Sequence, residues 1–230
     1  AFKGQGIMID KALEFFKNIL ETPSPSGYEQ PVQKVVREYA SDFADKINND
    51  SHGNVIAVKN PQASLRVMYA GHCDQIGLIV QYIDESGFLY VQPIGGWDPQ
   101  QLIGQRLSVW TAQGPVKGVI ARKPIHLLTE EERKQVPKIK DLWIDIGAHS
   151  KDQAAEKVRV GDPVTFSLSL QMLSDDFANS PGMDDKTGLW IVIEALRRVA
   201  TEQLSCALYA VSTARLSRVV QTAILESLRD

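Results

Sequence analysis

The stretch VMYAGHCDQIGLIVQYI, residues 67–83, contains the transition that decides the fold of this chain. Its first residues are apolar almost throughout, as expected of a short β-strand that is covered on both faces of a sheet. The polar sequence GHCD, residues 71–74, follows directly. In open α/β sheets, ligands gather beyond the carboxyl ends of the strands, so polar side chains at this point are well placed for binding.

The residues on either side of this stretch predict an α/β domain. Upstream, apolar residues recur at helical spacing over residues 9–20 and 32–43, and residues 55–58 form a strand-like apolar run. Downstream, residues 189–199 place apolar side chains on one face of a predicted helix that begins near Lys186. Residues 207–211 then have the pattern of a further strand.

Between about residues 79 and 166 the pattern changes. Short strand-like runs alternate with turn signals such as ESG, GGWDP, AQGP and VGDP. Closely spaced strands of this kind predict a small barrel or sandwich. Only one short helix is expected there, over residues 150–158, with Ser150 as its N-cap. We therefore predict an α/β domain that is interrupted by an all-β insertion.

Composition excludes several classes of protein. The net charge of the 230 residues is −3, and no run of Lys or Arg exceeds two residues, which argues against a nucleic-acid partner. No apolar run approaches the roughly 20 residues that span a bilayer. The first residues lack the pattern of a secretory signal, and two cysteines, Cys73 and Cys206, do not indicate a disulfide framework. We therefore expect a cytoplasmic protein.

His72 and Asp74 are the first candidates for chemistry. A neutral imidazole can give one nitrogen to a metal while a carboxylate accepts the proton of the other and fixes the tautomer. Residues i and i+2 of a strand lie on the same side, so Asp74 is correctly spaced for this role, whereas Cys73 should point away as a small buried residue. The alternative is a histidine at a strand end that bonds only to the backbone.

Asp184 and Asp185 are the second candidates. Adjacent carboxylates repel each other unless a cation offsets their charge, and one carboxylate can bridge the two metals of a two-metal hydrolase. The alternative is helix capping, because the pair directly precedes the predicted helix and acids are favoured at a helix N-terminus. The two acids alone do not decide between these interpretations.

Seven blocks in order resemble the tetrahedral dinuclear-metal aminopeptidases. They are PSPSGYE, GHCDQIGLIV, PIGGWDP, KPIHLL with EER, DLWIDIGA, VGDPVTF and MDDKTG, and the similarity extends from about residue 8 to about residue 213. Members of that family are described as glutamyl, leucyl, lysyl or deblocking aminopeptidases, and some as endoglucanases.

The resemblance implies a fold and a set of site residues. The fold is α/β, with a zinc-peptidase-like sheet flanked by helices and a small inserted all-β barrel. Residues 1–78 and 167–230 would form the catalytic domain, incomplete at its C-terminus, and residues 79–166 an inserted barrel for dimerisation. His72 resembles the first metal ligand, Asp74 the catalytic carboxylate that orients it, and Asp184 the bridging ligand, with Asp185 as its neighbour.

The resemblance also implies an activity and partners. Such enzymes bind two divalent cations, zinc or cobalt, which activate a water for attack on the first peptide carbonyl while a Glu acts as general base. Peptides would be the substrates. Dimers formed through the barrel would assemble into a homo-oligomer, a dodecamer if the family pattern holds.

The end of the sequence departs from this family. After ALYAVST the family has a Glu-Glu motif, then an Asp and a late His, whereas this chain continues as ARLSRVVQTAILESLRD. The matched residues therefore supply only two metal ligands, fewer than the three or four of a zinc centre. Truncation, a frame change and natural degeneration all remain open. We expect lost or impaired activity in this form, with a non-catalytic fragment that keeps the assembly domain as the alternative and an endoglucanase as a lesser one.

Overall fold

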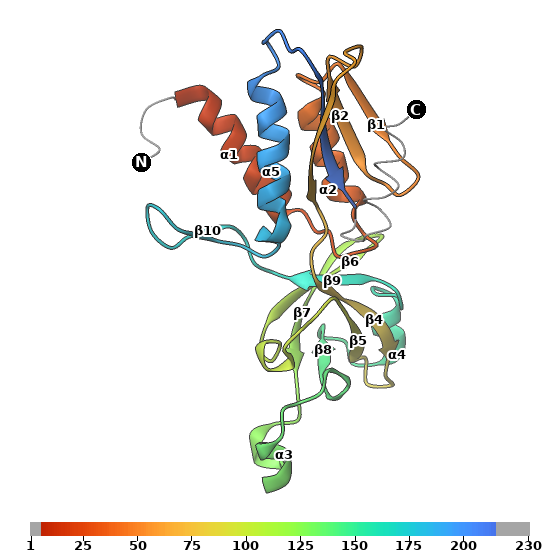
Figure 1. Cartoon of the computed structure of the whole chain (residues 1–230). Helices are drawn as coiled ribbons and strands as arrows, with labels where there is room; N and C mark the ends of the chain where they lie inside the picture. The colour runs from red at the N-terminus through yellow and green to blue at the C-terminus, as the bar shows by residue number, and fades with distance from the viewer. Residues whose placement is uncertain (1–5, 215–230) are drawn as a thin grey trace. The chain divides into compact units, whose positions relative to one another are not determined.

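The computed structural model describes residues 6–214, with side chains from Lys11 onward. These residues form two compact units, one made of the chain up to Gln75 together with the chain from Leu168, and the other of Ile76–Ser167 (Figure 1). The departure from the family pattern that we noted after ALYAVST falls largely outside the described residues. No helix in the described part is long and apolar enough to cross a membrane.

The first unit is a mixed sheet with helices packed on one face. Its four strands are β1 (Lys46–Asn49), β2 (Val55–Lys59), β3 (Arg66–His72) and β12 (Ala207–Thr213), in the order β1-β2-β12-β3. Only β12 and β3 are parallel. The helices are α1 (Gly6–Glu21), α2 (Gln30–Ala40) and α5 (Met183–Arg198), and a short hairpin pairs β10 (Gln171–Met172) with β11 (Ala178–Asn179).

Alternation along the strands explains why the helices lie on one face. Val55 and Ala57 of β2, with Leu208 and Ala210 of β12, join the core that includes the inward side chains of α1, α2 and α5. The intervening side chains, such as Ile56 and Val211, point to the opposite face, where they form a separate small cluster. The three helices beside the sheet can be followed in Figure 1.

The second unit contains a closed six-stranded barrel in the order β4-β5-β8-β7-β6-β9. Its strands are β4 (Gly77–Ile83), β5 (Leu89–Ile94), β6 (Arg106–Thr111), β7 (Gly114–Ala121), β8 (Trp143–Asp145) and β9 (Pro163–Phe166). Buried aliphatic side chains from all six strands fill its core. The predicted α/β fold with an all-β barrel insertion is confirmed. The proposed dimerisation role of residues 79–166 stays a prediction.

Two local expectations need correction. The apolar run that forms β3 is not covered on both faces by the described residues, because Tyr69 in the middle of the strand is 53% exposed. An apolar composition does not reveal which faces of a strand other elements cover. The insertion also holds more than the one helix we expected. Besides α4 (Lys151–Ala155), with Ser150 as its N-cap, it contains α3 (Glu130–Lys134) and three 3-10 turns, Pro99–Gln101, Ile125–Leu127 and Ile139–Asp141.

The exposed α3 is stabilised locally rather than by a core. Thr129 accepts a hydrogen bond from the backbone N–H of Glu132, whose side chain accepts one from the backbone N–H of Thr129. This reciprocal capping satisfies two backbone donors that would otherwise lack partners. The charged run TEEERK therefore forms a short solvated helix with Thr129 as its N-cap.

Candidate metal site

The close approach of β3 to α5 brings His72 and Asp184 together. β3 ends at His72, whose neighbour in the sheet is Thr213 of the parallel strand β12. Gly71 lies so near the start of α5 that a Cβ on it would be 2.7 Å from the backbone carbonyl carbon of Gly188. Only a residue without a side chain permits this approach, which sets the end of the strand beside the acid pair that opens the helix.

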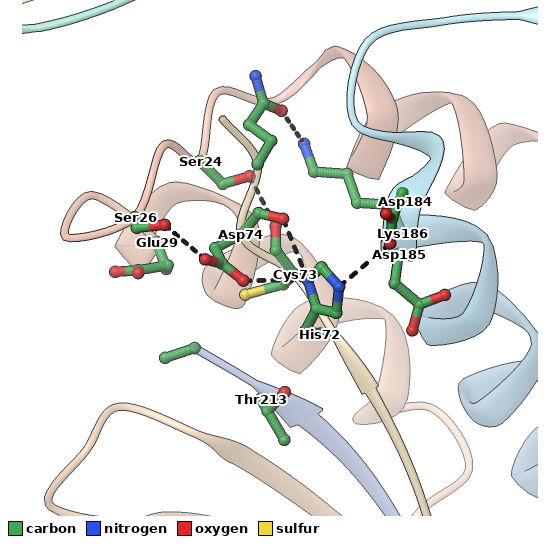
Figure 2. A network of polar contacts seen from close by, with 12 residues as sticks. Ser24, Ser26, Glu29, His72, Cys73, Asp74, Asp184, Asp185, Lys186 and Thr213 are labelled. Atoms are coloured by element: carbon green, nitrogen blue, oxygen red, sulfur yellow. Dashed lines mark hydrogen bonds and ion pairs between the residues drawn. The ribbon is translucent and has the colours of Figure 1, made fainter. Parts of the chain in front are cut away.

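The two ring nitrogens of His72 face different carboxylates (Figure 2). Nδ1 lies 3.0 Å from Oδ1 of Asp74 and 3.3 Å from the backbone oxygen of the same residue. Nε2 lies 3.3 Å from Oδ1 of Asp184. The imidazole is largely buried, with 13% of its side chain exposed, whereas the Asp184 carboxylate is 99% exposed. The alternative of a strand-end histidine that bonds only to the backbone is therefore wrong, because both ring nitrogens also face carboxylates.

Electrostatics reinforce the pairing of His72 with Asp74. The close contact with Asp74 raises the pKa of His72 above its ordinary value, although burial of the ring opposes this shift. For Asp74, burial acts to raise the pKa, but the contacts with His72 and Ser26 outweigh it, so the pKa lies below its ordinary value. Asp74 is therefore a buried carboxylate that accepts one hydrogen bond from Ser26 through Oδ2, while its Oδ1 lies 3.0 Å from the imidazole without the geometry of a hydrogen bond.

The two adjacent acids have different environments. Asp184 points toward His72, whereas Oδ1 of Asp185 accepts a hydrogen bond of 3.0 Å from the backbone N–H of Gly188. Both have non-helical backbone angles, and the peptide bond between them is cis. Asp185 thus acts as a cap for the helix, whereas Asp184 is an exposed carboxylate that faces an imidazole. Each of the two interpretations of the acid pair therefore applies to one of its residues.

Cys73 lies between His72 and Asp74 but takes no part in their contacts. Its side chain is fully buried in the core of the first unit, as predicted, and burial raises the pKa of the thiol to about 12. A thiol with this pKa carries almost no thiolate near neutral pH, so Cys73 is not a nucleophile or a ready metal ligand.

Sequence reasoning missed two groups around this site. Lys186 is completely buried, and its Nζ donates to the backbone oxygen of Thr22 (2.9 Å) and to Oε1 of Gln75 (2.7 Å). Ser26 donates to Oδ2 of Asp74 at 2.5 Å. A signal for Lys186 was present, because it stands three residues before Leu189 on the buried stripe of α5. Nothing in the PSPSG turn indicated the partner of Ser26.

The described residues contain no group of three or more His, Cys, Asp or Glu side chains that could hold a metal ion. His72 and Asp184 are therefore a pair of candidate ligands rather than a complete centre. The other three histidines of the sequence are exposed and lie outside this cluster: His52, His126 and His149.

The described chain combines an α/β domain with an inserted closed barrel, and a buried His–Asp pair lies at the end of a strand of the α/β domain. It is therefore an α/β protein with a polar site beyond the carboxyl end of a strand. The chain belongs to the M42 glutamyl aminopeptidase family, whose sequence profile matches residues 53–215.

Individual relatives agree with this membership. A lysyl aminopeptidase of Pyrococcus furiosus is 37% identical over 194 residues, which cover 83% of this chain and 56% of that protein. A TET aminopeptidase from the marine sediment archaeon Thaumarchaeota archaeon SCGC AB-539-E09 has a TM-score of 0.88 at 34% identity and covers 94% of this chain and 62% of that one.

The TET1 peptidase of Pyrococcus horikoshii, described as able to assemble into a tetrahedron or a large octahedral shell, has a TM-score of 0.83 at 30% identity. That match covers 93% of this chain and 64% of that one. The chain thus spans about half the length of the curated relatives it matches.

Proposed function

We propose that this protein is a metal-dependent aminopeptidase that removes N-terminal residues from peptides. Membership of the M42 family supports the activity. The observation that carries the proposal is the position of His72, whose Nε2 faces an exposed carboxylate oxygen of Asp184 at 3.3 Å while its Nδ1 faces Asp74. A histidine that is oriented by a carboxylate and whose second nitrogen is directed at another acid has the arrangement of a metal ligand.

The residues present fit divalent cations in part. Imidazole nitrogen and carboxylate oxygen are ligands that zinc and cobalt both accept. The near contact between His72 and Asp184 joins one of each, and the exposed Asp184 has a second oxygen for another ion. A complete centre needs further ligands and a general base, which we propose lie outside the described residues. This proposal does not select between zinc and cobalt.

The described residues have separate roles in this proposal. His72 and Asp184 would hold the divalent cations. Asp74 does not touch the substrate and instead keeps the proton on Nδ1, so that the lone pair of Nε2 stays available. When bound, the cations supply an activated water nucleophile and polarise the peptide carbonyl. Asp185, which caps α5, fixes the turn that carries Asp184.

The activity can be tested on the intact gene product with aminoacyl-nitroanilide substrates and added Co²⁺ or Zn²⁺. We expect cleavage that a chelator abolishes, and a loss of about 100-fold or more in kcat/KM for His72→Ala. His52→Ala is a matched control, because His52 lies in an exposed turn, and it should retain activity. Absence of cleavage in an intact product that has all its ligands would contradict the proposal.

We further propose that the 230-residue chain by itself is inactive or impaired. Its two matched ligands would bind metal weakly, with water completing the coordination. Titration calorimetry with Zn²⁺ tests this directly. Tight binding of two ions per chain would reject the impairment and, with it, the alternative of a non-catalytic fragment that keeps only the assembly domain.

Glycoside hydrolysis is the weaker alternative. It requires two carboxyl groups at about 5–5.5 or 6.5–9.5 Å that share the chemistry on one bond. No pair of acids with that role stands out in the described part of the chain, and Asp185 of the sequential pair Asp184–Asp185 is engaged by the backbone of α5. Hydrolysis of carboxymethylcellulose that survives a chelator would favour the endoglucanase instead.

We also propose that the protein forms homo-oligomers, as dimers through the inserted barrel and as a dodecamer in full assembly. The assemblies described for the P. horikoshii TET1 peptidase support self-association. A cytoplasmic location is part of the same proposal, and the free state of both Cys73 and Cys206 is consistent with a reducing compartment.

A further inference from the structure

The carboxylate of Asp74 has a second donor besides His72. Its Oδ2 accepts a hydrogen bond of 2.5 Å from Oγ of Ser26, while Oδ1 faces Nδ1 of His72 (Figure 2). Short hydrogen bonds to an ionised carboxylate are about twice as strong as those between neutral groups. Ser26, Asp74, His72 and Asp184 therefore form a chain of polar contacts that leads from the turn after α1 to the first turn of α5.

Ser26 is held in place by the backbone around it. The backbone oxygen of Ser24 accepts from the N–H of Gln75 (2.9 Å), and the buried hydroxyl of Ser24 donates to the backbone oxygen of Cys73 (2.7 Å). Pro25 pairs with Gln75 in a parallel bridge. The turn thus lies alongside the residues that follow β3, and these backbone contacts hold the hydroxyl of Ser26 next to Asp74.

The imidazole of His72 has two competing carboxylates, one at each nitrogen. A neutral ring has a single N–H, which can point to Asp74 from Nδ1 or to Asp184 from Nε2. Only the first choice leaves Nε2 with a lone pair for a metal. Anything that orients the Asp74 carboxylate toward Nδ1 therefore favours the Nδ1–H tautomer.

We infer that Ser26 is a positioning residue, which acts through Asp74 to hold His72 in the Nδ1–H tautomer and so presents Nε2 toward Asp184. Its hydroxyl must donate, because the ionised Asp74 can only accept. Without it, Oδ2 of a largely buried carboxylate loses its donor and the Asp74 carboxylate is free to rotate away from Nδ1 of His72. The consequence for metal binding rests on the proposed function, whereas the tautomer does not.

The test is the ¹⁵N spectrum of the His72 side chain in the metal-free 230-residue chain, at about pH 9, where an imidazole is neutral. The wild type should show predominantly Nδ1–H. We expect Ser26→Ala to raise the Nε2–H population several-fold and Ser26→Thr, which keeps the hydroxyl, to restore the wild-type spectrum. Ser41→Ala is the matched control, since the Ser41 hydroxyl donates to Glu38 on the surface, and it should change nothing.

Zinc affinity of the intact gene product is the second measurement. Loss of a residue that orients a metal ligand typically weakens affinity 10–100-fold, and we expect about tenfold for Ser26→Ala, one contact further out. Ser26→Cys, nearly isosteric and a weaker donor, gives the same comparison if the alanine variant does not fold. An unchanged tautomer in the folded Ser26 variants would overturn the inference. A changed tautomer without metal binding in the wild type would instead contradict the proposed function alone.

Discussion

Lys186 links three segments that meet at the candidate site. It is the largest fully buried side chain among the described residues, and its Nζ donates hydrogen bonds to the backbone oxygen of Thr22 and to the side chain of Gln75. Burial lowers its pKa to about 7. Sequence inspection places this lysine on the inward face of α5, but its partners come from two other parts of the chain and no local pattern identifies them.

We predict that Lys186→Met lowers the free energy of unfolding by about 1–3 kcal/mol, because the methionine fills a similar volume but leaves two acceptors without their donor. Urea denaturation at pH 7 measures this effect. Lys34→Met is the matched control, since Lys34 is exposed and pairs with Glu38 at 3.7 Å, and its effect should stay below about 0.5 kcal/mol. Equal effects of the two substitutions would contradict a structural role for Lys186.

At the scale of elements, Gly71 governs the contact between β3 and α5. We predict that Gly71→Ala destabilises the protein by about 1–3 kcal/mol or more, since the new methyl group would meet backbone atoms of α5 that cannot move independently. The melting temperature reports the effect. Gly96→Ala is the control, because a Cβ there has no neighbour within 4 Å. A Gly71→Ala protein as stable as the control would show that the helix is free to shift.

A second contact between elements joins α2 to α5. The hydroxyl of Tyr39 donates to Oε1 of Glu194 at 2.5 Å, and the buried Glu194 also binds the guanidinium of Arg197 through both oxygens. Burial, together with the hydrogen bond and negative charge of Glu194, raises the pKa of Tyr39 above its ordinary value. The folded protein therefore retains this proton at a pH where the unfolded chain has lost it.

The sign of the resulting pH dependence follows from this difference. Above about pH 10 the unfolded state binds fewer protons than the folded state, so stability falls as the pH rises. We predict that Tyr39→Phe is less stable than the wild type by about 1–2 kcal/mol at pH 8, and that the difference shrinks by about 1 kcal/mol by pH 11. Urea denaturation of both proteins across this range is the measurement. A difference that does not depend on pH would contradict the shifted titration.

At the scale of the whole molecule, exposed apolar side chains offer a candidate surface for the self-association that we propose. In the second unit, Ile125 is 67% exposed, and Leu127 and Val136 of the same segment, residues 125–136, are also exposed. Exposed apolar side chains that gather in one patch often mark an interface. We predict that the double substitution Ile125→Asp and Leu127→Asp lowers the mass of the assembly measured by sedimentation velocity. Val160→Asp, at an exposed valine outside this segment, should leave that mass unchanged. A wild type that sediments as a monomer would reject the proposed oligomer.

Local patterns in the sequence predict the order and type of the main elements and the candidates for chemistry. Helical spacing over residues 9–20 and 189–199 predicts α1 and α5, and the dense turn signals of residues 79–166 predict a small barrel or sandwich, because these patterns repeat with the period of the element. His72, Asp74 and Asp184 stand out by residue type and by their place at element ends.

Only the tertiary structure decided which of these residues meet. It separated Asp184, which faces His72, from Asp185, which caps α5, and it brought Ser26 and Lys186 to the site from segments that carry no signal of their own. It also placed β3 at the edge of the described sheet with Tyr69 exposed, although the apolar composition of this strand had suggested cover on both of its faces. Such contacts depend on the packing of elements distant in the chain, and hydrophobic periodicity records the direction of each side chain but not its partner.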